Sequence, residues 1–272
     1  MSVSVPRALS IAGSDPSAGA GIQADLKTFS ALGVYGLSAL TAITAQNTRG
    51  VYGVMEVPIA LIEAQIEAVL SDIGADAAKT GMLSSPAITT AVARQVEQWH
   101  LRLVVDPVMY AKGGNALLQP EAVATLRSLL LPLAEVVTPN LPEAQVLTGR
   151  SIVTLDDMRE AARMIHDQGP HHVVVKGGHR TEEPIDIYFD GTEILELHAE
   201  RIQTVHTHGT GCTFSAAITA LLARGLPVRQ AVIEAKRYIT EALRHAPGIG
   251  HGHGPVEHFW MWPCAGYRGE TP

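Results

Sequence analysis

The sequence predicts an α/β protein whose mostly parallel sheet is covered by helices on both faces. Short apolar segments rich in Val, Ile and Leu alternate along the chain with longer helix-like segments, as strands and helices do in such folds. Hydrophobic residues make up 46% of the 272 residues, enough for a large core. Polar residues also follow many of the predicted strands, and parallel strands end at one edge of their sheet. These strand-end residues are Asp15, Gln46, Lys79, Asp106, Asn140 and Lys176.

The first half of the chain begins with a short apolar segment, residues 7–12, which reads as a buried strand. A loop of small residues leads into a helix over 22–32, and Gly33 is placed to cap its end. Further strands are predicted at 35–45, 51–57, 75–79 and 101–105, and helices at 58–70 and 86–100.

The second half continues the alternation and adds a hairpin over 185–189 and 193–197, because Asp190-Gly191 favours a tight turn. The remaining strands are expected at 135–137 and 172–176, and the helices at 120–130, 142–147, 156–168, 210–224 and 228–245. We expect one domain over 1–272, with 1–6 and 260–272 as peripheral tails.

Composition excludes several classes of function. Charged residues are only 17% and the net charge is −7, which argues against a nucleic-acid partner. No apolar run approaches the ~18–20 residues that span a bilayer, and the N-terminus lacks the pattern of a secretory signal. The two cysteines, Cys212 and Cys264, do not suggest a disulfide framework. A cytoplasmic protein without a membrane partner is expected.

The most informative stretch is Gly209-Thr210-Gly211-Cys212, where a polar loop turns into a helix of small and apolar residues. Free N–H groups and the helix dipole make such a helix start an anion site. The same field is expected to lower the pKa of the Cys212 thiol, so that it could accept a substrate proton. The alternative is an ordinary helix start with Cys212 as a small buried residue.

A second glycine-rich segment, residues 19–24, matches the G-x-G-x-x-A fingerprint of dinucleotide-binding enzymes. The loop before it is longer than that motif needs, and no acidic residue follows the second strand to hold a ribose. We therefore prefer another function, with an NAD-binding enzyme as a rival.

Two strand ends carry residues suited to phosphate chemistry. Asn140 and Glu143 could serve Mg²⁺ through oxygen ligands, although they also fit a helix cap. Lys176, beside two glycines, could pair with a phosphate or be a solvated lysine before a turn. Residues 109–115 read as a flexible loop able to close over the site.

Two histidine pairs, His206 with His208 and His251 with His253, could suggest a metal site. Neither pair has a third histidine or a carboxylate at a spacing typical of zinc sites. We therefore do not expect a histidine metal site.

Together these motifs resemble the hydroxymethylpyrimidine/phosphomethylpyrimidine kinases of thiamine biosynthesis, in the ribokinase-like superfamily. The similarity runs from about residue 8 to residue 259. Its most specific segments are 11–17, 19–29, 44–48, 79–83, 106–109, 138–140, 175–179, 206–212 and 252–256.

The resemblance implies a ribokinase-like three-layer α/β/α sandwich with a small β lid, ATP and Mg²⁺ as cofactors, and a homodimer. It implies a transferase that phosphorylates 4-amino-5-hydroxymethyl-2-methylpyrimidine and then its monophosphate. By residue, it assigns Cys212, Gly209, Thr210 and Gly211 to catalysis, Gln46, Ala20, Met82 and Asp25 to the pyrimidine substrate, Lys176, Asp106 and Thr207 to ATP, and Asn140 and Glu143 to the metal.

The sequence departs from the family pattern in places. Ala18 stands where many members have glycine, which the loop should tolerate if φ is negative there. In the lid, Tyr110 and Asn115 stand where family members usually have other residues. Ala111 stands where some pyridoxal-phosphorylating relatives carry a second cysteine. The rivals are a pyridoxal kinase, a sugar kinase, which Cys212 in place of Asp disfavours, and a non-catalytic ligand-sensing module.

Overall fold

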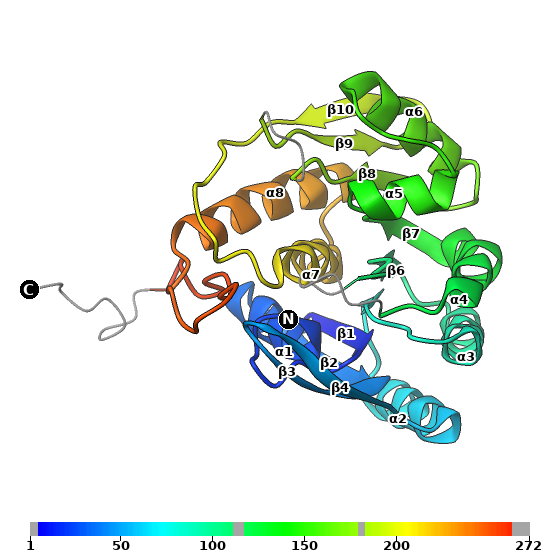
Figure 1. The fold of residues 1–272 in the computed structure, drawn as a ribbon. Coiled ribbons are helices and arrows are strands. Elements are labelled where there is room, and N and C mark those ends of the chain that lie inside the picture. The colour runs from blue at the N-terminus through cyan, green and yellow to red at the C-terminus, as the bar shows by residue number, and fades with distance from the viewer. Residues whose placement is uncertain (1–4, 111–116, 179–182, 263–272) are drawn as a thin grey trace, which may run out of the picture.

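The computed structural model describes residues 5–110, 117–178 and 183–262, and its central feature is an eight-stranded sheet (Figure 1). The strand order is β10-β9-β8-β7-β6-β5-β1-β2. Pairs from β2 to β8 are parallel, whereas β9 runs antiparallel to both of its neighbours. The strands are β1 (Arg7–Ala12), β2 (Tyr35–Leu40), β5 (Ala77–Thr80), β6 (Leu103–Val105), β7 (Ala134–Val137), β8 (His172–Val175), β9 (Asp186–Phe189) and β10 (Ile194–Leu197).

Helices cover both faces of this sheet, as the alternating pattern predicted. One core lies under the helices α2 to α6, and the other lies under α1, α7 and α8. The helices are α1 (Gly21–Ala31), α2 (Ile59–Asp72), α3 (Pro86–Gln98), α4 (Pro120–Thr125), α5 (Leu141–Thr148), α6 (Leu155–His166), α7 (Thr210–Ala223) and α8 (Val228–Arg244), with a π-helical turn at Leu126–Leu130 and a 3₁₀ turn at Leu131–Leu133 after α4. The three-layer prediction is confirmed.

A separate two-stranded antiparallel sheet, β3 (Ala42–Asn47) with β4 (Gly50–Glu56), corrects one prediction. The expected continuous strand over 35–45 is wrong, because the chain bends at Thr41 between β2 and β3. The Thr41 N–H still donates to Ala12 of β1, and its hydroxyl donates to the Met82 carbonyl. Beyond this bend the chain leaves the main sheet and forms the small β element.

Tight turns follow the residue types that predicted them. The hairpin of β9 and β10 is present, and the Asp190 carboxylate accepts from the backbone N–H groups of Thr192 and Glu193. Gly191 has φ of 92°, a conformation that favours glycine. No helix of the described residues is long and apolar enough to cross a membrane.

Candidate functional site

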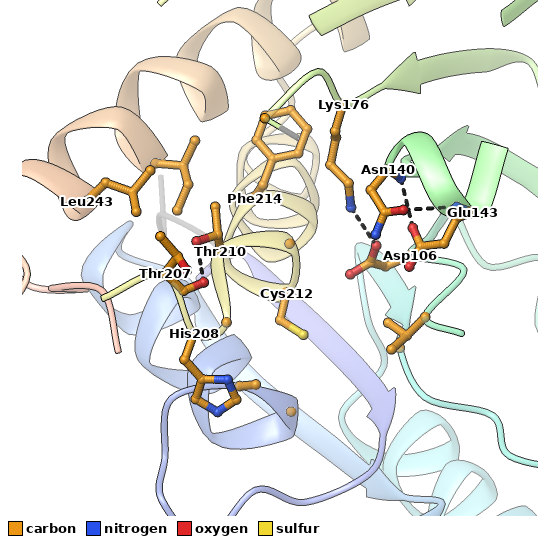
Figure 2. Close-up of a pocket in the computed structure, with 18 of the residues that line it drawn as sticks. Asp106, Asn140, Glu143, Lys176, Thr207, His208, Thr210, Cys212, Phe214 and Leu243 are labelled. Atoms are coloured by element: carbon orange, nitrogen blue, oxygen red, sulfur yellow. Dashed lines mark hydrogen bonds and ion pairs between the residues drawn. The ribbon is translucent and has the colours of Figure 1, made fainter. Parts of the chain in front are cut away.

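A cavity of about 790 Å³ lies at the carboxyl ends of the parallel strands, where the start of α7 meets the strand-end loops (Figure 2). Its wall contains all but one of the residues that the sequence proposed for the site. These are Ala20, Gln46, Met82, Asp106, Asn140, Glu143, Lys176, Thr207, Gly209, Thr210, Gly211 and Cys212. The structure therefore brings these residues together in one cavity, whereas the site and the role of each residue stay predictions.

The anion loop forms the start of α7, as the sequence predicted. Gly209 is the N-cap residue with φ of 75°, and a Cβ on it would lie 1.6 Å from the Gly19 carbonyl oxygen. Glycine is therefore required both by the conformation and by the close packing of the two loops. No described side chain caps this helix, and although the Thr210 N–H donates to the Thr207 carbonyl at 3.4 Å, the N–H groups of Gly211 and Cys212 remain available to an anion in the cavity.

Lys176 and Asp106 form an ion pair on the cavity wall, with 3.0 Å between Nζ and Oδ1. Hydroxyl groups of Thr138 and Ser215 also approach the Asp106 carboxylate at 3.3 Å. Burial lowers the pKa of Lys176, but the neighbouring carboxylates outweigh it and hold that pKa above its ordinary value. Gly211 faces this pair, because a Cβ there would lie 3.3 Å from the lysine nitrogen. The anion loop, Lys176 and the space left beside Gly211, which has no side chain, together form a cradle for phosphate.

Asn140 and Glu143 form a capping box on α5, so the helix-cap reading of this motif is correct. The Glu143 N–H donates to the Asn140 side chain, and the Asn140 N–H donates to the Glu143 carboxylate. Burial raises the pKa of Glu143 to about 7, Lys176 opposes that rise, and Asp106 adds to it. Two carboxylates and one lysine therefore meet here.

The donor set fits Mg²⁺ held in part by phosphate. A cation would relieve the crowding of the Asp106 and Glu143 carboxylates. The described residues hold no cluster of three or more acidic, histidine or cysteine side chains that could bind a metal alone. Mg²⁺ is commonly bound by one or two carboxylates together with substrate phosphates, which is the arrangement available here.

Gln46, on β3, lines the same cavity, as do Thr44, Ala20 and Met82. The Thr44 hydroxyl lies 3.4 Å from Oε1 of Gln46, and Nε2 of His208 lies 3.4 Å from its Nε2. The carboxamide thus lies among polar atoms on one side of a pocket suited to a small ring.

One pair of residues in this pocket was missed by the sequence reasoning. His208 Nε2 lies 2.7 Å from Oδ2 of Asp15, and both side chains are buried. The two residues are 193 positions apart, and the motif around His208 gave only a weak metal signal. Asp15 had been noted as a strand-end residue, but nothing in the sequence could show its partner.

Asp15 also decides against the dinucleotide alternative. Its carboxylate accepts hydrogen bonds from the backbone N–H groups of Gly19 and Ala20, at 3.2 and 2.8 Å. These amides of the G-x-G-x-x-A segment are therefore already satisfied and do not face a pyrophosphate. In the same loop, Ala18 has φ of 60°, so the negative φ under which the loop was expected to tolerate alanine is not present.

Asp25 is the exception among the proposed site residues, because it does not line the cavity. It is fully buried, and its carboxylate pairs with Lys79 at 2.8 Å and accepts from the Ser10 hydroxyl at 2.6 Å. A direct contact between Asp25 and substrate is therefore a prediction that this geometry corrects. Helix α1 places the carboxylate behind the cavity wall.

The expected pKa of Cys212 is also corrected. Burial raises the pKa of this thiol to about 12, and the Lys79 ammonium is the strongest influence that lowers it. The helix start therefore does not by itself produce a thiolate, because desolvation outweighs its field. The side chain nevertheless points into the cavity between the anion loop and Asp106 (Figure 2).

The sheet, the glycine-rich anion loop and Lys176 define the class of protein, a ribokinase-like kinase. The family model for phosphomethylpyrimidine kinase matches residues 15–257. The chain belongs to the phosphomethylpyrimidine kinase family.

Individual relatives agree with this assignment. The chain is 54% identical over 259 residues to the hydroxymethylpyrimidine/phosphomethylpyrimidine kinase of Rhizobium meliloti, covering 94% of this chain and 97% of that protein. It is 49% identical over 260 residues to the Bacillus subtilis protein of the same name, covering 94% and 96%. The structure of an ADP complex of Bacillus subtilis pyridoxal kinase matches with a TM-score of 0.89 at 44% identity, covering 95% and 99%.

Proposed function

We propose that this chain phosphorylates hydroxymethylpyrimidine and then its monophosphate, with ATP as the phosphoryl donor, in thiamine biosynthesis. One observation carries the proposal: a single cavity is lined by the carboxamide of Gln46, by Cys212 and the anion loop, and by Lys176 and Asp106. The 243 residues from 15 to 257 that match the family model support the same activity.

The carboxamide of Gln46 accounts for recognition of the pyrimidine. An amide oxygen can accept from the ring amino group while the amide NH₂ donates to the neighbouring ring nitrogen. Ala20 and Met82 line the same cavity and would supply apolar contacts to the ring. This bidentate pattern places the hydroxymethyl group toward the start of α7.

The nucleotide occupies the other half of the cavity in our proposal. Apolar residues of α7, α8 and the loop before α7 form a surface that suits an adenine ring, and Thr207 lies beside them. These apolar residues are Ile202, Phe214, Ile239 and Leu243. Figure 2 shows Phe214 and Leu243 on this side and Lys176 at the phosphate end.

Phosphoryl transfer follows from this arrangement. The substrate hydroxyl oxygen bonds to the γ-phosphorus, the bond to the ADP oxygen breaks, and the hydroxyl proton passes to the thiolate form of Cys212, which becomes the thiol. The N–H groups of Gly209 to Cys212 stabilise the charge on the transferred group, and Lys176 neutralises the ATP phosphates. Mg²⁺, served by Glu143 and Asn140, would supply further neutralisation of phosphate charge.

We also propose a cytoplasmic homodimer in which residues 1–272 act as one kinase domain. The dimer proposal rests on β3 and β4, whose cross-strand pair Ile43 and Met55 is exposed at 46% and 62%. Paired apolar side chains on the exposed face of a small sheet are suited to burial against a second copy.

A substrate panel tests the function. Folded protein with Mg·ATP is offered hydroxymethylpyrimidine, its phosphate, pyridoxal and ribose, and ADP release is measured. We expect the two pyrimidines to give the highest kcat/KM. A preference for pyridoxal would favour the pyridoxal kinase alternative, and no ADP with any of the four would favour a ligand-sensing module. Position 111, Ala111, lies outside the described residues, so its bearing on pyridoxal rests on sequence alone.

A further inference from the structure

The buried ion pair of Lys79 and Asp25 is not used by the mechanism above. Lys79 lies on β5 and Asp25 on α1, both side chains are fully buried, and Nζ lies 2.8 Å from Oδ1. The second carboxylate oxygen accepts from Ser10, which is the register partner of Lys79 on β1. Donors on both oxygens are the pattern of an ionised carboxylate.

A buried ion pair such as this one is weak evidence of a role in stability. Removing two charges from water carries a desolvation penalty that the mutual attraction often fails to recover, and apolar replacements of such pairs are frequently neutral or stabilising. The pair is also oriented: Lys79 belongs to the cavity wall together with Gly21, Gly81 and Cys212, whereas Asp25 lies behind that wall. The positive end therefore faces the site.

We propose that Lys79, fixed by Asp25 and Ser10, is a positioning residue that acts through Cys212, its ammonium favouring the thiolate that receives the substrate proton. This inference rests on the proposed function. Lys79 is fully buried in the cavity wall and acts on Cys212, the residue that touches the substrate. The proton balance is simple: the thiolate becomes a thiol as the new oxygen–phosphorus bond forms and ADP leaves, and the thiol later releases its proton to solvent.

Four charged groups act on the Cys212 sulfur. Lys79 from β5 and Lys176 from the end of β8 favour the thiolate, and Asp106 after β6 and Asp25 from α1 oppose it. The Gly21 N–H of α1 also favours the thiolate. Of these, Lys79 has the largest effect on the pKa of the thiol after burial itself. Both lysines are paired, Lys176 with Asp106 and Lys79 with Asp25, and Lys79 is the one whose loss should matter more because its effect on the thiol is the larger.

Alkylation of Cys212 by iodoacetamide tests the inference without substrate. The rate, followed by mass spectrometry of the peptide that contains Cys212, is proportional to the thiolate fraction well below the thiol pKa. The test variant carries Lys79→Gln and Asp25→Asn together, so that a hydrogen-bonding neutral pair replaces the ion pair. We expect its alkylation rate to fall about tenfold or more between pH 7 and 10, which corresponds to one pKa unit.

The matched control replaces a different ion pair. Arg102 and Glu135 interact at 3.5 Å at the amino ends of β6 and β7, away from the cavity. The double variant Arg102→Met with Glu135→Gln should leave the alkylation rate and its pH dependence unchanged.

Each outcome decides the proposal. An unchanged rate in the folded Lys79→Gln, Asp25→Asn variant overturns it. If that variant does not fold, Lys79→Met with Asp25→Asn carries the same test. If neither neutral pair folds, the ion pair serves stability, which also overturns the proposal. The failure of the proposed function is seen separately, as absence of ADP release by the wild-type protein on the substrate panel.

Discussion

At the scale of single residues, Cys212 is the group on which the chemistry depends. Its thiol lies at the first turn of α7, yet burial raises its pKa to about 12. A thiol in that state donates a hydrogen bond rather than accepting a proton, so the charges around it decide whether it can act as a base. The backbone N–H of Cys212 serves the anion loop whatever the side chain is.

Substitution of Cys212 separates these two roles. We expect Cys212→Ala to reduce kcat roughly 10²-fold with little change in the KM for ATP, because the N–H groups that bind phosphate remain. Cys212→Ser, which keeps a hydrogen-bonding group but no thiolate, should be similarly slow. Steady-state kinetics of both variants check this. A kcat within twofold of wild type for Cys212→Ala would return the residue to a packing role.

At the scale of the elements, the start of α7 depends on two glycines, because neither carries a Cβ atom. Gly211 leaves room beside Lys176 and Asp106, and Gly209 allows contact with the loop at Gly19. The first turn is also held from behind, because the Thr213 hydroxyl bonds to Nε2 of His258 at 3.2 Å. The C-terminal segment thereby supports the anion loop.

Filling the cradle should weaken ATP binding. In Gly211→Ala the new Cβ would lie 3.3 Å from Lys176 Nζ and 3.8 Å from Asp106 Oδ2, so the lysine must shift. Loss of a charge-assisted contact costs about 1.5–3 kcal/mol, and we expect the KM for ATP to rise by roughly 10-fold or more. Gly50→Ala, with nothing within 4 Å of the added Cβ, is the control. An unchanged KM for ATP would remove Gly211 from the phosphate site.

His258 should make stability depend on acid. Burial lowers the pKa of His258 to about 3, below the ordinary value of 6.5, so the folded protein keeps it neutral. As pH falls below 6.5 the unfolded chain takes up a proton that the folded chain does not, and stability is lost by up to about 1.4 kcal/mol per pH unit.

Urea unfolding at pH 7 and at pH 4.5 checks this prediction. We expect the wild type to lose about 2 kcal/mol more than His258→Gln between the two values, because glutamine does not titrate but can still accept from Thr213. Equal losses in both proteins would show that His258 is protonated in the folded state.

The helices and strands also show which parts of the fold could be predicted from the sequence. Periodicity and caps predicted the helices and the β9–β10 hairpin, because those signals are local. The break at Thr41 was not predictable, since residues 35–45 contain neither proline nor a Gly-rich turn signal at the bend, and the bend depends on hydrogen bonds to Ala12 and Met82. The capping box at Asn140 and Glu143 was readable as a cap, and its proximity to Lys176 was not.

The site was predicted in position more fully than in detail. The strand-end residues and the glycine loop predicted the edge of the sheet at which the site lies, because the parallel strands all end at that edge. Contacts such as Asp15 with His208, and the burial of Asp25 against Lys79, join residues far apart in the chain. Desolvation of Cys212 likewise depends on the packed surroundings and could not be read from its place at a helix start.

At the scale of the whole molecule, the small sheet of β3 and β4 serves two purposes. One side brings Thr44 and Gln46 to the cavity, and the cross-strand pair Ile43 and Met55 is exposed to solvent. Assembly and substrate binding would therefore be joined through one element if the chain forms the proposed dimer.

A charge in the exposed pair should prevent assembly. We expect wild-type protein to sediment at twice the mass of the chain and Met55→Lys to sediment as a monomer, because a buried unpaired charge is costly. Val153→Lys changes an apolar side chain before α6 that is 74% exposed, against 62% for Met55, and should remain dimeric. A wild-type monomer in analytical ultracentrifugation would refute the dimer.

In the proposed function, one cavity transfers phosphate to a pyrimidine alcohol and then to the resulting phosphate ester. ³¹P NMR of the protein with Mg·ATP and the pyrimidine monophosphate observes that second transfer directly. We expect the monophosphate signal to be replaced by the two coupled signals of a pyrimidine diphosphate, at the same rate as ADP forms. Formation of ADP and inorganic phosphate with the monophosphate unchanged, or no reaction in folded protein, would contradict it.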